Sequence, residues 1–129
     1  MKMEVSWQEN FIFKAKCGEH EVLTDQHQTE GGTDKALTPA ELFVASLGTC
    51  IGVYIVRFCK RHNLPAEGLK VLLDWTVVKD PWRIGSIKAE IHYPHNISEP
   101  EKRGLLRMAA SCFVHETILH QPEIKVELK

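Results

Sequence analysis

The chain has 129 residues, of which 43% are apolar and 26% are charged, and its formal net charge at pH 7 is -1. This length suits one ordinary domain with a single hydrophobic core, so we expect residues 1–129 to form one domain. The near-neutral charge leaves no excess of lysine and arginine to neutralise phosphates, which argues against a nucleic-acid partner.

The first residues, Met1 to Glu4, lack the charged, apolar and small-residue order of a secretory signal. We therefore expect a cytoplasmic protein. In that reducing compartment cysteines are thiols and any disulfide is transient. The cysteines stand at positions 17, 50, 59 and 112, and none of them belongs to a CxxC pair.

The first third of the chain alternates between apolar and polar residues, as β-strands do. We expect strands at Glu4–Gln8, Asn10–Lys16 and His20–Asp25, followed by a polar, glycine-containing loop over residues 30–35. A helix should follow this loop, because the order Thr-Pro-Ala-Glu at 38–41 is a capping box with proline at the first helical position.

This helix should run from Pro39 to about Arg61, where basic residues complement the negative end of the helix dipole. Its uncharged stretch, Leu42–Val56, is shorter than the roughly 20 apolar residues that a membrane-spanning helix needs, so we expect a core helix. Apolar residues occupy nearly every face and must be enclosed on all sides. We therefore predict an intertwined homodimer in which a second subunit covers one face; enclosure within one chain is the alternative.

The second half predicts two more strands, Leu69–Lys79 and Arg83–Tyr93, joined by a turn. A second capping box at 98–101 begins a helix that reaches Ser111 or Cys112. A short helix over Phe113–His120 and a final strand over Pro122–Lys129 complete the chain. Runs of strands separated by two main helices are typical of an α+β fold.

Two cysteines stand in apolar, small-residue surroundings. Gly48 and Gly52 flank Cys50 and would let a second helix or a small substrate approach its sulfur. A helix break after Cys112 would set its sulfur at the positive end of the next helix, which favours a thiolate. The alternative is that both are inert, buried, small apolar residues, as we expect for Cys59. We expect Cys17, at a strand end before Gly18, to be an incidental thiol.

Two sequence motifs resemble those of a known family. The first is the run Gly31-Gly32 and Thr38-Pro39-Ala40-Glu41-Leu42-Phe43-Val44-Ala45-Ser46-Leu47-Gly48-Thr49-Cys50. The second is Ala110-Ser111-Cys112-Phe113-Val114-His115-Glu116-Thr117-Ile118, in which Phe113 replaces the usual proline. Together they are similar to the signatures of the OsmC/Ohr family, the osmotically inducible protein C and organic hydroperoxide resistance proteins, and the predicted element order agrees over essentially the whole chain.

The resemblance implies an α+β domain in a tightly intertwined dimer, and thiol-dependent reduction of organic hydroperoxides. By position, Cys50 matches the peroxidatic cysteine of the family and Cys112 matches the resolving cysteine. An external dithiol would then reduce the disulfide that they form. No cofactor is implied.

The chain also departs from the peroxidase branches of the family. Those branches use an early arginine, but no arginine precedes Arg57, and the glutamate they place ten residues before the cysteine is Ala40 here. Glu41 remains a catalytic candidate, although its place in the capping box suggests a structural role. His115 is a candidate proton partner for Cys112; no second ligand pair at zinc spacing accompanies these two residues, so we predict no metal site.

Three hypotheses follow for the function. The first is a thiol peroxidase that acts on organic hydroperoxides through Cys50 and Cys112 in the response to oxidative stress. The second is a non-enzymatic OsmC-like protein that senses oxidants or binds an apolar small molecule, which the missing arginine favours. The third is a purely structural dimer with inert thiols.

Overall fold

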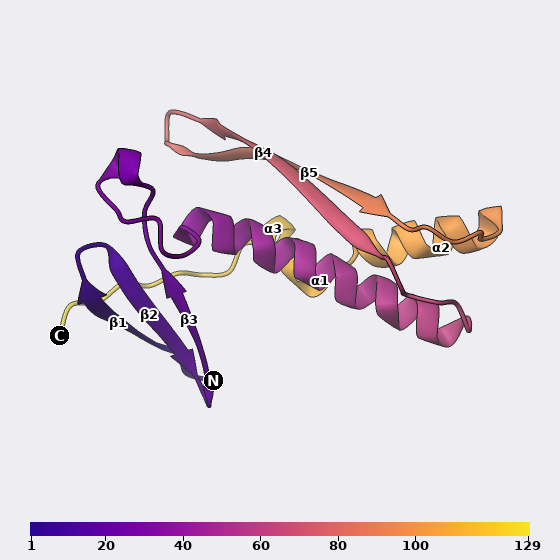
Figure 1. Cartoon of the computed structure of the whole chain (residues 1–129), viewed down its shortest axis with the longest axis horizontal. Coiled ribbons are helices and arrows are strands. Elements are labelled where there is room, and N and C mark those ends of the chain that lie inside the picture. Colours follow the sequence, from indigo (N-terminus) through magenta and orange to yellow (C-terminus); the bar gives the residue numbers. More distant parts are fainter. The chain divides into compact units, whose positions relative to one another are not determined.

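The computed structural model describes all residues from 1 to 129. It contains two antiparallel sheets and three α-helices, and this confirms the predicted α+β class. The chain divides into two compact units, residues 1–45 and residues 46–129. Each unit is described below by itself, and Figure 1 labels the elements.

The first unit is built on a three-stranded antiparallel sheet in the order β1-β2-β3. Its strands are β1 (Glu4–Glu9), β2 (Ile12–Cys17) and β3 (His20–Thr24), at the predicted places. A short 3-10 helix, η1 (Gln28–Glu30), lies in the loop that follows. Sequence alternation therefore identified all three strands.

A buried aspartate organises the loop between β3 and the first helix. Asp25 Oδ2 accepts hydrogen bonds from the Thr33 hydroxyl at 2.6 Å and from the Lys35 backbone N–H at 3.1 Å. Asp25 Oδ1 accepts one from the Gln26 backbone N–H at 2.7 Å. These bonds, with that of the Thr33 hydroxyl foremost, lower the pKa of Asp25 to about 2 although its burial acts in the opposite direction.

Helix α1 (Pro39–Arg61) begins in the first unit and continues through the second. The predicted capping box is present: the Thr38 backbone N–H donates to Glu41 Oε2 at 2.9 Å, and the Glu41 backbone N–H donates to Thr38 Oγ1 at 3.2 Å. The reciprocal bonds satisfy two backbone donors at the start of α1. Both predicted ends of the helix are confirmed.

The second unit adds an antiparallel hairpin, β4 (Lys70–Val78) and β5 (Arg83–His92), and the helices α2 (Glu99–Ala110) and α3 (Phe113–Leu119). The second predicted capping box is also present, between Ser98 and Glu101. The predicted strand over Pro122–Lys129 is absent, because a strand needs a neighbouring strand to pair with and residues 121–129 have none in this single chain.

The hydrophobic core of the second unit lies between α1, α2 and the hairpin. Its fully or almost fully buried residues come mainly from the two helices: Leu47, Ile51, Ile55, Phe58, Cys59, Leu105, Ala109 and Cys112. Val71, Ile87 and Ile91 of the hairpin pack against this cluster. In length and composition α1 is the one helix that could cross a membrane. Its residues nevertheless form the centre of the core, as expected of a core helix.

Candidate thiol site

Cys50 lies on α1 in the second unit and is half-buried. The two glycines beside it differ in what surrounds them. A Cβ atom at Gly48 would lie 2.4 Å from Leu73 Cδ1, so any larger residue there would force the Leu73 side chain of β4 to move. A Cβ atom at Gly52 would meet nothing within 4 Å. Gly48 thus serves packing, whereas Gly52 faces open space on a different side of α1 from Cys50, because residues two apart on a helix do not face each other.

Cys112 lies at the predicted helix break. Helix α2 ends at Ala110, and Cys112 has an extended backbone (φ -68°, ψ 153°) as the N-cap residue of α3. Its Sγ accepts the His115 backbone N–H at 3.4 Å. The thiol therefore occupies the place that a serine or aspartate side chain commonly takes at a helix N-terminus.

The pKa of the Cys112 thiol is shifted in the direction opposite to the one predicted from its place at a helix N-terminus. Burial is the largest influence and raises the pKa of the Cys112 thiol, and the nearby Cys50 thiol raises it further. The backbone N–H groups of His115 and Val114 lower the pKa, but each has a smaller effect than burial. The predicted preference for a thiolate at Cys112 is wrong, because the loss of hydration at a fully buried sulfur outweighs the helix terminus.

The structure brings the two predicted cysteines together. The Cys50 side chain packs against the cluster that contains Cys112 and lies close enough to raise the pKa of the Cys112 thiol, and both are free thiols. No basic side chain hydrogen-bonds to either sulfur. The other cysteines lie elsewhere: Cys17 is exposed at the end of β2, and Cys59 is buried 4.0 Å from the Tyr93 hydroxyl. Cys50 and Cys112 are therefore the one cysteine pair in contact.

His115 contacts Cys112 through its main chain rather than its ring. Its backbone N–H is the donor to the sulfur, whereas its half-buried imidazole makes no hydrogen bond. A role of the ring in proton transfer stays a prediction.

Glu41 belongs to the first unit, where both of its carboxylate oxygens are engaged. One closes the capping box with Thr38, and the other lies 2.7 Å from His27 Nε2. The backbone bond from Thr38 is the largest of the effects that lower the pKa of Glu41. The structure thus gives Glu41 a helix-capping role, and its catalytic role stays a prediction.

His27 and Asp34 were not identified from the sequence. The second ring nitrogen of His27, Nδ1, lies 3.1 Å from Asp34 Oδ1. Hydrogen bonding to Asp34 and then to Glu41 raises the pKa of His27. No local signal links the three residues, because the path of the loop brings them together. They do not form a group of metal ligands.

Comparison with known proteins decides the family. A family model described as "OsmC-like protein" matches residues 32–128, a range that contains both cysteines. The chain belongs to the OsmC-like family. No curated protein matches the sequence.

Solved structures show the same fold as this OsmC-like protein. A putative osmotic stress induced and detoxification response protein from Psychrobacter arcticus has a TM-score of 0.84 at 18% identity, over 91% of this chain and 87% of that one. An OsmC-like protein from Mycoplasma pneumoniae has a TM-score of 0.75 at 16% identity, over 93% and 87% of the two chains. The organic hydroperoxide resistance protein OhrB of Bacillus subtilis has 0.63 at 16% identity, over 100% and 98%.

Proposed function

We propose that this OsmC-like protein is a cytoplasmic thiol peroxidase that reduces organic hydroperoxides as part of the oxidative stress response. The observation that carries the proposal is the contact between the Cys50 and Cys112 thiols, which lie far apart in the sequence and meet in the second unit. Two thiols in contact can become a disulfide without a large movement of the backbone.

The reaction has two chemical steps before reduction. The Cys50 thiolate attacks the distal peroxide oxygen, the O–O bond breaks, and the alkoxide takes a proton to leave as the alcohol; Cys50 becomes a sulfenic acid. The Cys112 sulfur then attacks the Cys50 sulfur, water leaves, and a disulfide forms. A dithiol reductant returns both cysteines to thiols by two exchange steps and becomes oxidised itself.

The surroundings of the two sulfurs support this division of roles. Cys112 is fully buried and its burial raises the pKa of its thiol, so it is less suited than Cys50 to make the first attack on the peroxide as a thiolate. Cys50 is less buried than Cys112, so a hydroperoxide can reach its sulfur more easily. The neighbouring apolar residues of α1 favour an alkyl hydroperoxide over hydrogen peroxide.

Names of related structures point in the same direction. A Legionella pneumophila structure is named as an organic hydroperoxide resistance protein OsmC. A Vibrio cholerae structure, named as a putative organic hydroperoxide resistance protein, holds captopril in one of its active sites. We extend the hydroperoxide substrate class to this chain, with His115 as the proposed proton partner and Glu41 as a catalytic candidate whose carboxylate already serves the helix cap.

We propose that the protein works as an intertwined homodimer. Val53 on α1 is 49% exposed, and Trp75 and Val77 on β4 are 40% and 55% exposed. The final segment alternates charged residues with Ile124 and Val126, which are almost fully exposed. A second subunit that packs on α1 and β4 and pairs with residues 122–129 would bury these exposed apolar side chains.

A non-enzymatic redox sensor or apolar small-molecule-binding protein is the second candidate. The observation that favours it is the absence of any basic side chain hydrogen-bonded to either sulfur, since peroxidatic thiolates are normally stabilised by such a group. In this case the disulfide would form but would not turn over rapidly.

One experiment separates these candidates. Reduced protein is mixed with stoichiometric cumene hydroperoxide, and the Cys50–Cys112 disulfide is followed by peptide mass spectrometry, with an external dithiol added in parallel samples. Rapid disulfide formation with turnover supports the peroxidase, and disulfide without turnover supports the sensor. Cys50→Ser should abolish the reaction, whereas the matched variant Cys59→Ser should retain it. Unreacted thiols in the parent protein would refute both candidates.

A further inference from the structure

We infer that a cavity between the C-terminal end of α1 and helix α2 binds a small organic anion with an apolar body. The cavity has a volume of about 460 Å³ and is lined only by residues of the second unit. This volume lies in the range of small-molecule sites. The inference does not depend on the proposed peroxidase activity.

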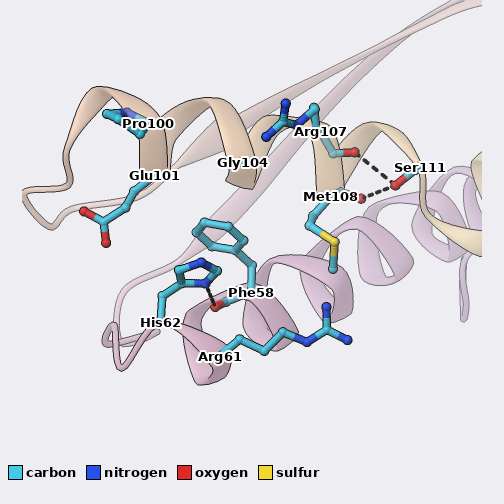
Figure 2. Close-up of a pocket in the computed structure, with 9 residues that line it drawn as sticks. All are labelled: Phe58, Arg61, His62, Pro100, Glu101, Gly104, Arg107, Met108 and Ser111. Atoms are coloured by element: carbon cyan, nitrogen blue, oxygen red, sulfur yellow. Dashed lines mark hydrogen bonds between the residues drawn. The ribbon is translucent and has the colours of Figure 1, made fainter.

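The floor of the cavity is formed largely by aromatic and apolar side chains. Figure 2 shows the Phe58 ring and the Met108 side chain between the two helices. The His62 ring stacks on Phe58 with ring centroids 4.0 Å apart, and its Nδ1 lies 2.9 Å from the Phe58 carbonyl oxygen. A Cβ atom at Gly104 would come within 2.8 Å of Phe58 Cε2, so the close approach of α2 to this ring requires glycine.

The rim carries two arginines without a partner in the chain. Arg61 extends from α1 and Arg107 from α2, and neither guanidinium forms an ion pair or a hydrogen bond. Glu101 is the one carboxylate at the cavity, and its Oε1 accepts the Ser98 backbone N–H at 3.0 Å. The cavity therefore holds two positive charges against one negative charge that already serves a helix cap.

The dipole of α2 accounts for Arg107, but the dipole of α1 does not require Arg61. A basic residue in the last turn of a helix stabilises it, and both arginines occupy such turns. Lys60 already supplies that charge at the end of α1. Either guanidinium group at the rim can receive a carboxylate ligand, because the planar guanidinium group donates two parallel hydrogen bonds to a carboxylate, and the other adds positive charge at the same cavity.

The test uses octanoate as the probe, with octan-1-ol and acetate as the neutral and the short comparison compounds. Each is titrated into ¹⁵N-labelled reduced protein, and the backbone amide signals are followed by NMR. We expect octanoate to shift Gly104, Met108 and Ser111 in a saturable manner. Octan-1-ol lacks the charge and acetate lacks the apolar body, so each should bind about tenfold more weakly or worse.

The variants Arg61→Gln and Arg107→Gln should each weaken octanoate binding about tenfold, and the double variant should abolish saturation. Arg103→Gln is the matched control, since Arg103 lies on α2 but does not line the cavity; it should bind octanoate as the parent does. Unperturbed signals at the cavity, equal affinity for octan-1-ol, or full binding by the double variant would each overturn the inference.

Discussion

Different interactions stabilise the interior of each of the two units of this OsmC-like protein. In the second unit the central residues are apolar and buried, and the two contacting thiols lie among them. In the first unit the strands keep exposed apolar side chains, and the order of the following loop comes from Asp25 and from the His27 cluster with Asp34 and Glu41. Stability of the second unit should thus depend on side-chain volume, and that of the first on pH.

The largest effect should come from truncation in the second unit. Leu105 on α2 is 3% exposed, and Leu105→Ala should lower the free energy of unfolding by about 2–5 kcal/mol through lost burial and a cavity. Its neighbour Leu106 is 50% exposed, so Leu106→Ala should cost much less. Urea unfolding measures both; equal losses would contradict the description of the core.

Removing the N-cap side chain from each of the two capping boxes should cause a smaller loss of stability, of similar size at α1 and α2. Thr38→Ala at α1 and Ser98→Ala at α2 should each reduce stability by about 1 kcal/mol, because each removes the acceptor of a backbone N–H. Thermal unfolding followed by circular dichroism measures the change. Thr38→Ser keeps the acceptor oxygen and should restore most of the loss; failure to do so would argue against the cap.

Asp25 should make the first unit sensitive to acid. Its pKa is lowered from 3.8 to about 2 by hydrogen bonds that favour the carboxylate, so its contribution is present above the unfolded value of 3.8. That contribution is lost as the pH falls through about 2. Asp25→Asn should remove this acid dependence and destabilise the loop at neutral pH. Amide exchange at Thr33 and Lys35 reports the effect, and unchanged exchange would contradict it.

His27 should have the smallest effect on stability, and its pH dependence should be opposite in sign to that of Asp25. Its pKa is raised above 6.5, so the stabilising contacts of the imidazolium with Asp34 and Glu41 are fully present below pH 6.5. They are lost as the pH rises through the raised pKa. NMR titration of the ring measures this pKa directly. In Asp34→Asn the pKa of His27 should fall toward 6.5, and an unshifted value would contradict the cluster.

Much of the fold could be predicted because its signals are local. Alternation identified the paired strands, and the capping boxes placed the beginnings of α1 and α2. The predicted strand over Pro122–Lys129 has the same alternation but has no neighbouring strand, and pairing is not a property of a segment alone.

At the candidate site, too, some features could be predicted from local sequence and others could not. Cys50 and Cys112 were selected from their apolar surroundings and from the family resemblance, and the helix break at Cys112 was predicted from the chain. Three features depend on tertiary packing and cannot be predicted from the order of residues along the chain. They are the raised pKa of the buried Cys112 thiol, the His27 cluster and the cavity between α1 and α2. The sequence therefore predicted two cysteines that lie close together, but not the electrostatic surroundings of their sulfurs.

We propose that Cys50 attacks the peroxide and that Cys112 resolves the product. The most direct test is to trap the sulfenic acid with dimedone after adding cumene hydroperoxide to the Cys112→Ser variant, and to locate the adduct by mass spectrometry. We predict an adduct on Cys50 in Cys112→Ser and no adduct on Cys112 in Cys50→Ser. An adduct on Cys112 in the second variant, or none on Cys50 in the first, would contradict it.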